Sequence, residues 1–187
     1  MEVVLYTDLN CPFCYATEQR LEALDAQHLV EWRGVEHEPD LPVPIDTEDD
    51  ELNAELADEV AQVRSRAPEV EITQPAGKSN TAYALEFAAA AERTDPERAR
   101  RVRHAMYRAF WVDRQDISSP DVLAGITREH GLDSVEIRSE DKLRVTSWRL
   151  DWERSPLRGV PLLARSDGEV LYGLKDSQTL AGFVRPG

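Results

Sequence analysis

The hydrophobic positions at the start of the chain predict a strand, a helix and a second strand. Residues 3–7 are apolar and rich in β-branched residues, which is typical of a short buried strand. A helical pattern then continues to about residue 27, and residues 29–35 predict the second strand. One face of this helix repeats at three- and four-residue spacing and should pack inward. Its positions are Cys14, Thr17, Leu21, Leu24 and His28.

The middle of the chain is helical in pattern for about a hundred residues. It follows residues 36–50, which are rich in proline and acidic residues and predict a loop. Asp95-Pro96 and Ser119-Pro120 are typical helix starts, with a capping side chain before a first-turn proline. We expect helices over residues 52–66 and 79–93 (with Ser79 as a cap), one beginning at Pro96, one from Pro120 to about Gly131, and one over residues 139–152.

The end of the chain returns to a strand pattern. Residues 160–165 and 170–172 predict two strands, Asp167-Gly168 between them predicts a hairpin turn, and a short helix should begin near Ser177. Neither end of the chain could bury a sheet by itself. Joined, the two ends give a four-stranded mixed sheet with helices on both faces, in the order β-α-β, helical block, β-β-α. We therefore predict an α/β fold with one domain from residues 1–45 plus 153–187 and an inserted all-helical domain from residues 46–152.

The two cysteines of the chain stand three residues apart, in Cys11-Pro12-Phe13-Cys14. The unit lies between the first strand and its helix, so Cys11 comes at a helix N-terminus, where unpaired N–H groups and the helix dipole stabilise an anion. We expect Cys11 to be the nucleophile of a dithiol and Cys14, one turn later and facing inward, to be the resolving thiol. Pro12 suits the first helical turn, and Phe13 offers a hydrophobic rim for a substrate.

Two residues limit how acidic Cys11 should become. Phe13 cannot donate a hydrogen bond to sulfur, and Asp8 would oppose a thiolate if its carboxylate lay close. We therefore expect a Cys11 pKa below the ~8.5 of a free thiol but above the ~3.5 of the most acidic reactive cysteines.

A metal site is the main alternative interpretation of the cysteine pair. Zinc usually takes four ligands, and beyond the two sulfurs the chain offers four histidines, none at a ligand spacing from another. We therefore expect no metal. The histidines are His28, His37, His104 and His130.

Several features together resemble the DsbA-like thioredoxin family, and within it the FrnE-type oxidoreductases and the related 2-hydroxychromene-2-carboxylate isomerases. They are the Cys-Pro-Phe-Cys unit after a first strand, the helical insertion, and Gly159-Val160-Pro161 before a later strand. Weaker similarities are Trp32-Arg33, Ser79-Asn80-Thr81 and the stretch from residue 105 to residue 132. The resemblance implies a thioredoxin-like fold with a cis peptide bond before Pro161, beside the dithiol. The backbone of Val160 would then pair with an incoming peptide, and the family permits a homodimer.

Three functions follow from these residues and this resemblance. The first is a protein disulfide oxidoreductase that acts on a disulfide- or thiol-bearing protein or a small thiol, with no cofactor except glutathione as a co-substrate. The second is a glutathione-dependent isomerase or transferase, for which the resemblance implies a serine where this chain has Cys11. The third is a redox-controlled binding module or holdase.

The composition restricts the partners and the location. The formal net charge of −14 disfavours nucleic acids and anionic membranes, because the field of the protein repels phosphate. No window approaches the ~18 apolar residues of a membrane span, and no targeting segment precedes the first strand. We therefore expect a cytoplasmic protein, where paired cysteines are more often catalytic than structural.

The acidic composition leaves two interpretations open. Of the 22 basic residues only Lys78, Lys142 and Lys175 are lysines, and this profile fits either an adaptation to high salt or an ordinary acidic protein. If the surface is a salt adaptation, the free energy of unfolding should rise between low and molar KCl as repulsion between carboxylates is screened. Denaturant titrations at both concentrations measure this, and an unchanged or lower value in molar KCl rejects the adaptation.

Overall fold

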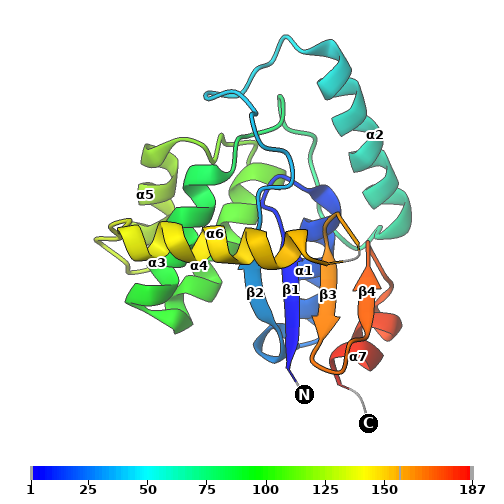
Figure 1. Ribbon diagram of the computed structural model, residues 1–187. Coiled ribbons are helices and arrows are strands. Elements are labelled where there is room, and N and C mark those ends of the chain that lie inside the picture. The colour runs from blue at the N-terminus through cyan, green and yellow to red at the C-terminus, as the bar shows by residue number, and fades with distance from the viewer. Residues whose placement is uncertain (1, 156, 186–187) are drawn as a thin grey trace.

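The fold is built on a mixed sheet of four strands, and the computed structural model describes residues 2–155 and 157–185. The strand order is β2-β1-β3-β4, in which β1 is parallel to β2 and antiparallel to β3, and β3 is antiparallel to β4 (Figure 1). The strands are β1 (Val3–Thr7), β2 (Glu31–Gly34), β3 (Leu162–Arg165) and β4 (Val170–Tyr172).

The helices of the described residues lie mostly between β2 and β3 in the sequence. A 3-10 turn, η1 (Gln27–Leu29), also precedes β2. The helices are α1 (Pro12–Ala23), α2 (Asp50–Arg66), α3 (Ala82–Thr94), α4 (Pro96–Trp111), α5 (Pro120–Glu129), α6 (Ser139–Glu153) and α7 (Ser177–Val184). This order and the mixed sheet confirm the predicted α/β fold class with its β-α-β start and β-β-α end.

The two faces of the sheet are covered by different helices, as Figure 1 shows for α6 on one side and α1 with α7 on the other. Side chains alternate between the faces along each strand. Val3, Leu5 and Leu163 lie in a cluster with residues of α1 and α7. Tyr6 and Leu162 face the opposite way, into the larger core that α3, α4 and α6 complete. Both faces of β1 are therefore buried, which explains its nearly continuous apolar sequence.

Helix α1 ends earlier than its hydrophobic pattern suggested. It stops at Ala23, because Asp25 adopts a positive φ of 48° and the Ala26 N–H bonds back to the Leu21 carbonyl at 2.8 Å. Leu24 is consequently only half-buried and His28 is exposed. The inward-facing stripe therefore ends at Leu21.

The start of α3 also differs from the prediction. Ser79 does not cap this helix, because its hydroxyl donates instead to the Asp116 carboxylate at 2.8 Å. The helix begins at Ala82, whose N–H donates to the Asn80 side-chain oxygen at 3.0 Å. The N-cap position is therefore Thr81, two residues after Ser79.

The predicted inserted domain shares one hydrophobic core with the sheet. Trp111 of α4 donates its indole N–H to the Leu9 carbonyl at 2.9 Å, and the Tyr107 hydroxyl lies 2.6 Å from the Thr7 hydroxyl. The division at residues 45/46 and 152/153 stays a prediction, and residues 1, 156 and 186–187 of the first predicted domain lie outside the described residues. Helix α4 therefore supports the end of β1 directly.

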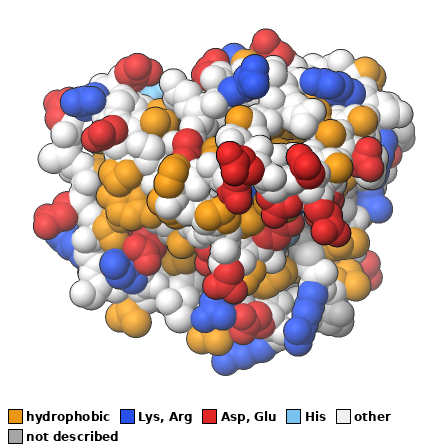
Figure 2. Space-filling model, turned by 90° about the horizontal axis from the view of Figure 1, so that it is seen from above, with side chains coloured by type: hydrophobic (Ala, Val, Ile, Leu, Met, Phe, Trp, Pro, Cys, Tyr) orange, Lys and Arg blue, Asp and Glu red, His pale blue; other side chains and the backbone are white. Residues whose placement is uncertain are grey.

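No helix in the described part of the chain has both the length and the apolar character needed to cross a bilayer. Acidic side chains gather near the middle of the face shown in Figure 2, as a net charge of −14 leads one to expect.

A pair of Leu→Ala substitutions in helices tests this description of the core. Leu85 in α3 is fully buried in the larger cluster, whereas Leu143 in α6 is 69% exposed. We expect Leu85→Ala to lower the free energy of unfolding by about 2–5 kcal/mol, through lost burial and a residual cavity. Leu143→Ala should change it by no more than about 0.5 kcal/mol. Urea titrations measure both, and equal losses would contradict the assignment of the core.

Candidate active site

The two cysteines lie where β1 passes into α1. Cys11 is the N-cap of the helix, with φ −96° and ψ 118°, and Pro12 occupies the first turn. The Cys14 backbone N–H donates to the Cys11 sulfur at 3.4 Å. One of the unpaired donors at the end of the helix is therefore directed at this sulfur, as the sequence predicted. Both thiols are free, and neither is open to solvent, since Cys11 is only 4% exposed and Cys14 not at all.

The environment of Cys11 favours its thiolate despite burial. Burial by itself would raise the pKa of this thiol, but the Cys14 thiol and backbone N–H and the positive charge of His37 together hold the pKa below its ordinary value. This direction agrees with the predicted activation of Cys11.

The pKa of Cys14 is shifted upward, opposite to that of Cys11. Burial, the hydrogen bond with Cys11 and the negative charge of that group raise the pKa of Cys14 well above its usual range. The Thr7 hydroxyl and the Asp8 N–H, the latter 3.4 Å away, hydrogen-bond to its sulfur and lower the pKa only in part. The pair thus consists of one acidified thiol and one thiol held protonated.

The bend before β3 reaches the dithiol from far along the chain. The Cys11 thiol donates to the Val160 carbonyl at a sulfur–oxygen distance of 3.8 Å. The Val160–Pro161 peptide bond is cis, and Gly173 closes the bend by donating its N–H to the Pro161 carbonyl at 2.9 Å. The bend therefore sets a backbone acceptor directly beside the more acidic sulfur.

The predicted substrate-binding residues differ in exposure. Pro12 and Pro161 are buried and Val160 is 8% exposed, so their side chains offer little surface. Phe13 is half-buried, and the Arg66 guanidinium lies 5.9 Å from its ring centroid. The structure brings all four residues to the dithiol, and their role in binding a substrate stays a prediction.

The Asp8 carboxylate does not point at the thiols. Its side chain is fully buried, and it accepts hydrogen bonds from the Leu9 N–H at 2.7 Å and from the His37 N–H at 2.9 Å. The His37 ring Nδ1 lies 2.8 Å from the same carboxylate. Burial would lower the pKa of His37, but Asp8 and the negative charge of Cys11 raise it to about 9. The sequence-based concern that Asp8 opposes the thiolate overlooked this cationic partner.

A chain of charged groups continues from His37 toward α2. His37 Nε2 lies 3.8 Å from Glu38, Lys78 Nζ lies 2.6 Å from the same carboxylate, and Glu59 of α2 lies 3.3 Å from Lys78. The Lys78 side chain is only 1% exposed, and the attraction of both glutamates raises its pKa although burial opposes the charge. These contacts connect α2 to the loop after β2, over the dithiol end of the sheet (Figure 1).

The cysteines and the bend were predictable from the sequence, but these surrounding groups were not. His37 was considered there only as a metal ligand, and Lys78 and Tyr107 were not considered for the site. The sole signal available was a histidine two residues after the predicted second strand, at the end of the sheet where the first strand also ends. In the described residues no three potential ligands are grouped to hold a metal ion.

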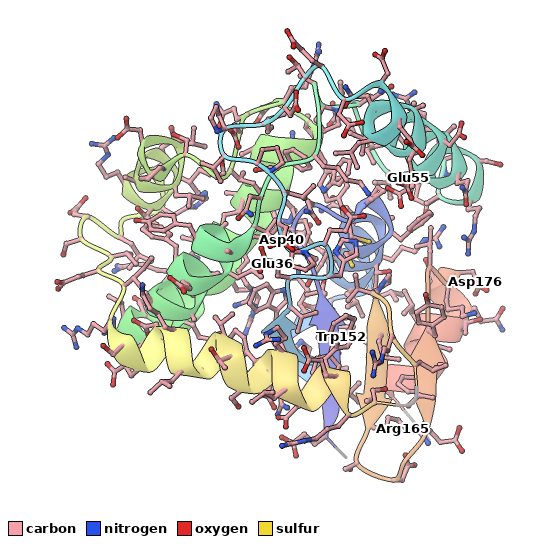
Figure 3. The ribbon with its side chains drawn as sticks, turned by 45° about the horizontal axis from the view of Figure 1, so that its top comes forward. Glu36, Asp40, Glu55, Trp152, Arg165 and Asp176 are labelled. Carbon is pink, nitrogen blue, oxygen red and sulfur yellow. The ribbon has the colours of Figure 1, made fainter. Side chains whose placement is uncertain are left out.

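A cavity of about 530 Å³ opens beside His37. Figure 3 shows two of its lining residues, Glu36 in the loop after β2 and Trp152 at the end of α6. Trp152 donates its indole N–H to the Gly159 carbonyl at 3.1 Å, which joins this wall to the bend at Pro161. The cavity therefore adjoins His37 and the residue before the Val160–Pro161 bend.

Residues 2–185 match the family model described as the DSBA-like thioredoxin domain. No curated protein matches the sequence.

Three of the similar solved structures share the fold over nearly the whole chain. A candidate protein disulfide isomerase from Nitrosomonas europaea is 16% identical with a TM-score of 0.77, covering 98% of this chain and 96% of its own. The cytosolic disulfide reductase DsbM from Pseudomonas aeruginosa is 17% identical with a TM-score of 0.71, covering 100% and 93%. A 2-hydroxychromene-2-carboxylate isomerase is 16% identical with a TM-score of 0.66, covering 98% and 92%. At these identities the likeness shows the fold alone.

The opposite pKa shifts predict unequal reactivity of the two thiols. In the reduced protein, a pulse of iodoacetamide followed by peptide mapping should modify Cys11 first, with a rate midpoint below the ~8.5 of a free thiol. Cys14 should react at least about tenfold more slowly at pH 7, because its thiolate is disfavoured and buried. After unfolding in guanidinium chloride the two rates should converge. A Cys11 midpoint at the free-thiol value, or Cys14 reacting first, would contradict this description of the site.

Proposed function

Since the chain belongs to the DsbA-like thioredoxin family, we propose that it is a thiol–disulfide oxidoreductase that works through the Cys11–Cys14 dithiol. The observation that supports this proposal most is that the two thiols have opposite pKa shifts. Cys11 has a lowered pKa at a helix N-terminus, and Cys14 has a raised pKa behind it. A dithiol reductant needs one sulfur ready to attack and one held back until a mixed disulfide exists.

The proposed reaction transfers two electrons in two exchanges. The Cys11 thiolate attacks one sulfur of a partner disulfide, the partner bond breaks, and the released partner thiolate takes up a proton. Cys14 then loses its proton to solvent and attacks the Cys11 sulfur, which releases the second partner sulfur as a thiolate that also takes up a proton. The partner is now a dithiol and this chain carries a Cys11–Cys14 disulfide. An external thiol, such as glutathione or a reduced dithiol protein, restores the starting state by the reverse exchanges.

The bend at Val160 supports a polypeptide as the partner. The Val160 carbonyl accepts a hydrogen bond from the Cys11 thiol, and it loses that donor when Cys11 ionises. A peptide N–H next to the partner disulfide can then take the vacated acceptor, as in addition of an edge strand. The half-buried ring of Phe13, two residues after Cys11, would offer apolar contact to the same partner.

In a cytoplasmic location, which we propose with this function, the prevailing thiols keep such a pair mostly reduced. The direction would then be reduction or isomerisation of partner disulfides. The presence of both sulfurs favours this function over the glutathione-dependent isomerase, for which the family resemblance implies a serine in place of Cys11.

Reduction of insulin by dithiothreitol tests the proposal, with precipitation of the free B chain as the readout. The wild-type protein should shorten the lag, and Cys11→Ser should return the rate to the uncatalysed background because the attacking sulfur is gone. The matched Cys14→Ser variant should instead accumulate a mixed disulfide with insulin that mass spectrometry detects. If Cys11→Ser keeps the wild-type rate, the proposal is wrong. Glutathione binding without any disulfide reduction would favour the isomerase.

A further inference from the structure

The motif itself holds little that would stabilise a thiolate by charge. Between the cysteines stand Pro12, which has no N–H, and Phe13, which has no polar atom in its side chain. The Cys11 sulfur is nevertheless almost fully buried, where an anion is costly without a compensating cation. The Cys14 thiol and backbone N–H offset part of that cost, and a positive charge from another part of the fold would offset more.

Asp8 connects such a cation to both cysteines. Its backbone N–H donates to the Cys14 sulfur at 3.4 Å, and its carbonyl accepts the Cys11 N–H at 3.4 Å. One oxygen of its buried carboxylate accepts a hydrogen bond from the His37 backbone N–H. The same oxygen lies within hydrogen-bonding distance of the His37 ring Nδ1. The imidazole is therefore fixed by the same residue whose backbone fixes the two thiols.

We propose that His37 is a positioning residue of the dithiol, whose imidazolium, locked by Asp8, stabilises the thiolate of Cys11 from outside the Cys-Pro-Phe-Cys unit. The inference rests on the proposed function only in taking the dithiol as the reactive group. His37, in the loop after β2, would then stabilise the thiolate as a polar residue between the cysteines could have done.

The other charges around His37 leave this assignment intact. Glu38 approaches the second ring nitrogen at 3.8 Å, but Lys78 at 2.6 Å and Glu59 beyond it complete a separate ion-paired group. From α6, Arg149 and Glu153 on the cavity beside His37 pair with each other at 2.7 Å. The remaining charged lining residues of that cavity are Glu36 and Arg158.

The balance of these charges on Cys11 is attractive. The positive charge of His37 lowers the pKa of Cys11 more than the negative charge of Glu59 on α2 raises it. Because the pKa of His37 is raised to about 9, the imidazole stays protonated throughout the neutral range. The attraction is lost only as the pH rises through that value.

The coupling must be reciprocal. If His37 stabilises the thiolate, the thiolate stabilises the imidazolium by the same free energy. Removing the Cys11 charge, by substitution or by oxidation to the disulfide, should therefore lower the pKa of His37. A histidine that merely held the loop in place through Asp8 would titrate at the same pH in both states.

The first experiment measures iodoacetamide alkylation of reduced Cys11 against pH in His37→Gln, which keeps a donor for Asp8 but removes the charge. We expect the midpoint to rise by ~1 unit and the rate at pH 6 to fall about tenfold. The matched control is His28→Gln, an exposed histidine in η1 that should leave the profile unchanged. A wild-type profile in His37→Gln would overturn the proposal.

The second experiment leaves the Asp8–His37 pair intact and so remains decisive if His37→Gln fails to fold. NMR titration of the histidine rings should give a lower His37 pKa in Cys11→Ser than in the reduced wild-type protein, with His28 unaffected. Equal His37 values in the two proteins would overturn the proposal.

Neither readout depends on turnover, which separates this inference from the proposed function. If the wild-type protein fails to reduce insulin while His37→Gln still shifts the Cys11 profile, the proposed function fails and the coupling stands. If insulin is reduced in a Cys11-dependent way while both titrations are unchanged, the coupling fails and the function stands.

Discussion

The proposed thiol chemistry depends on one contact, the Cys14 backbone N–H directed at the Cys11 sulfur across the first turn of α1. It exists because Cys11 stands at the N-cap in an extended conformation, where its side chain folds back over unpaired donors. The sheet determines that conformation, since the central strand β1 must deliver the chain directly into α1 on its buried face. An unpaired helix terminus has thereby become an anion site for sulfur.

Burial strengthens the effect of that contact on the Cys11 pKa and also makes a thiolate costly at this position. With Cys11 4% exposed and Cys14 fully enclosed, both thiolates are disfavoured by desolvation, so small differences in neighbouring dipoles and charges decide which sulfur ionises. The charged groups near the dithiol are themselves paired, Asp8 with His37 and Lys78 with two glutamates. Buried ions of this kind are tolerated because each one has a partner at hydrogen-bonding or ion-pairing distance.

Most elements were predictable because their causes are local. The strand at residues 3–7 follows from its β-branched apolar residues. The start of α4 follows from Asp95 before Pro96, since the Asp95 carboxylate accepts hydrogen bonds from the N–H groups of Glu97 and Arg98. Of the two errors, one had a distant cause and the other a local one. Ser79 was diverted from capping by Asp116, and the positive φ of Asp25 ended α1 before its apolar stripe ended.

The sequence by itself determined which atoms can react, because two cysteines three apart at a strand-to-helix junction meet the same helix end whatever surrounds them. Only the tertiary structure decided how acidic the first sulfur becomes. His37 lies 29 positions from Asp8 and Val160 lies 149 from Cys11, and their approach depends on the pairing of β1 with β2 and β3. Electrostatic interactions in a buried site depend on distance and burial through space, and no spacing along the chain encodes either quantity.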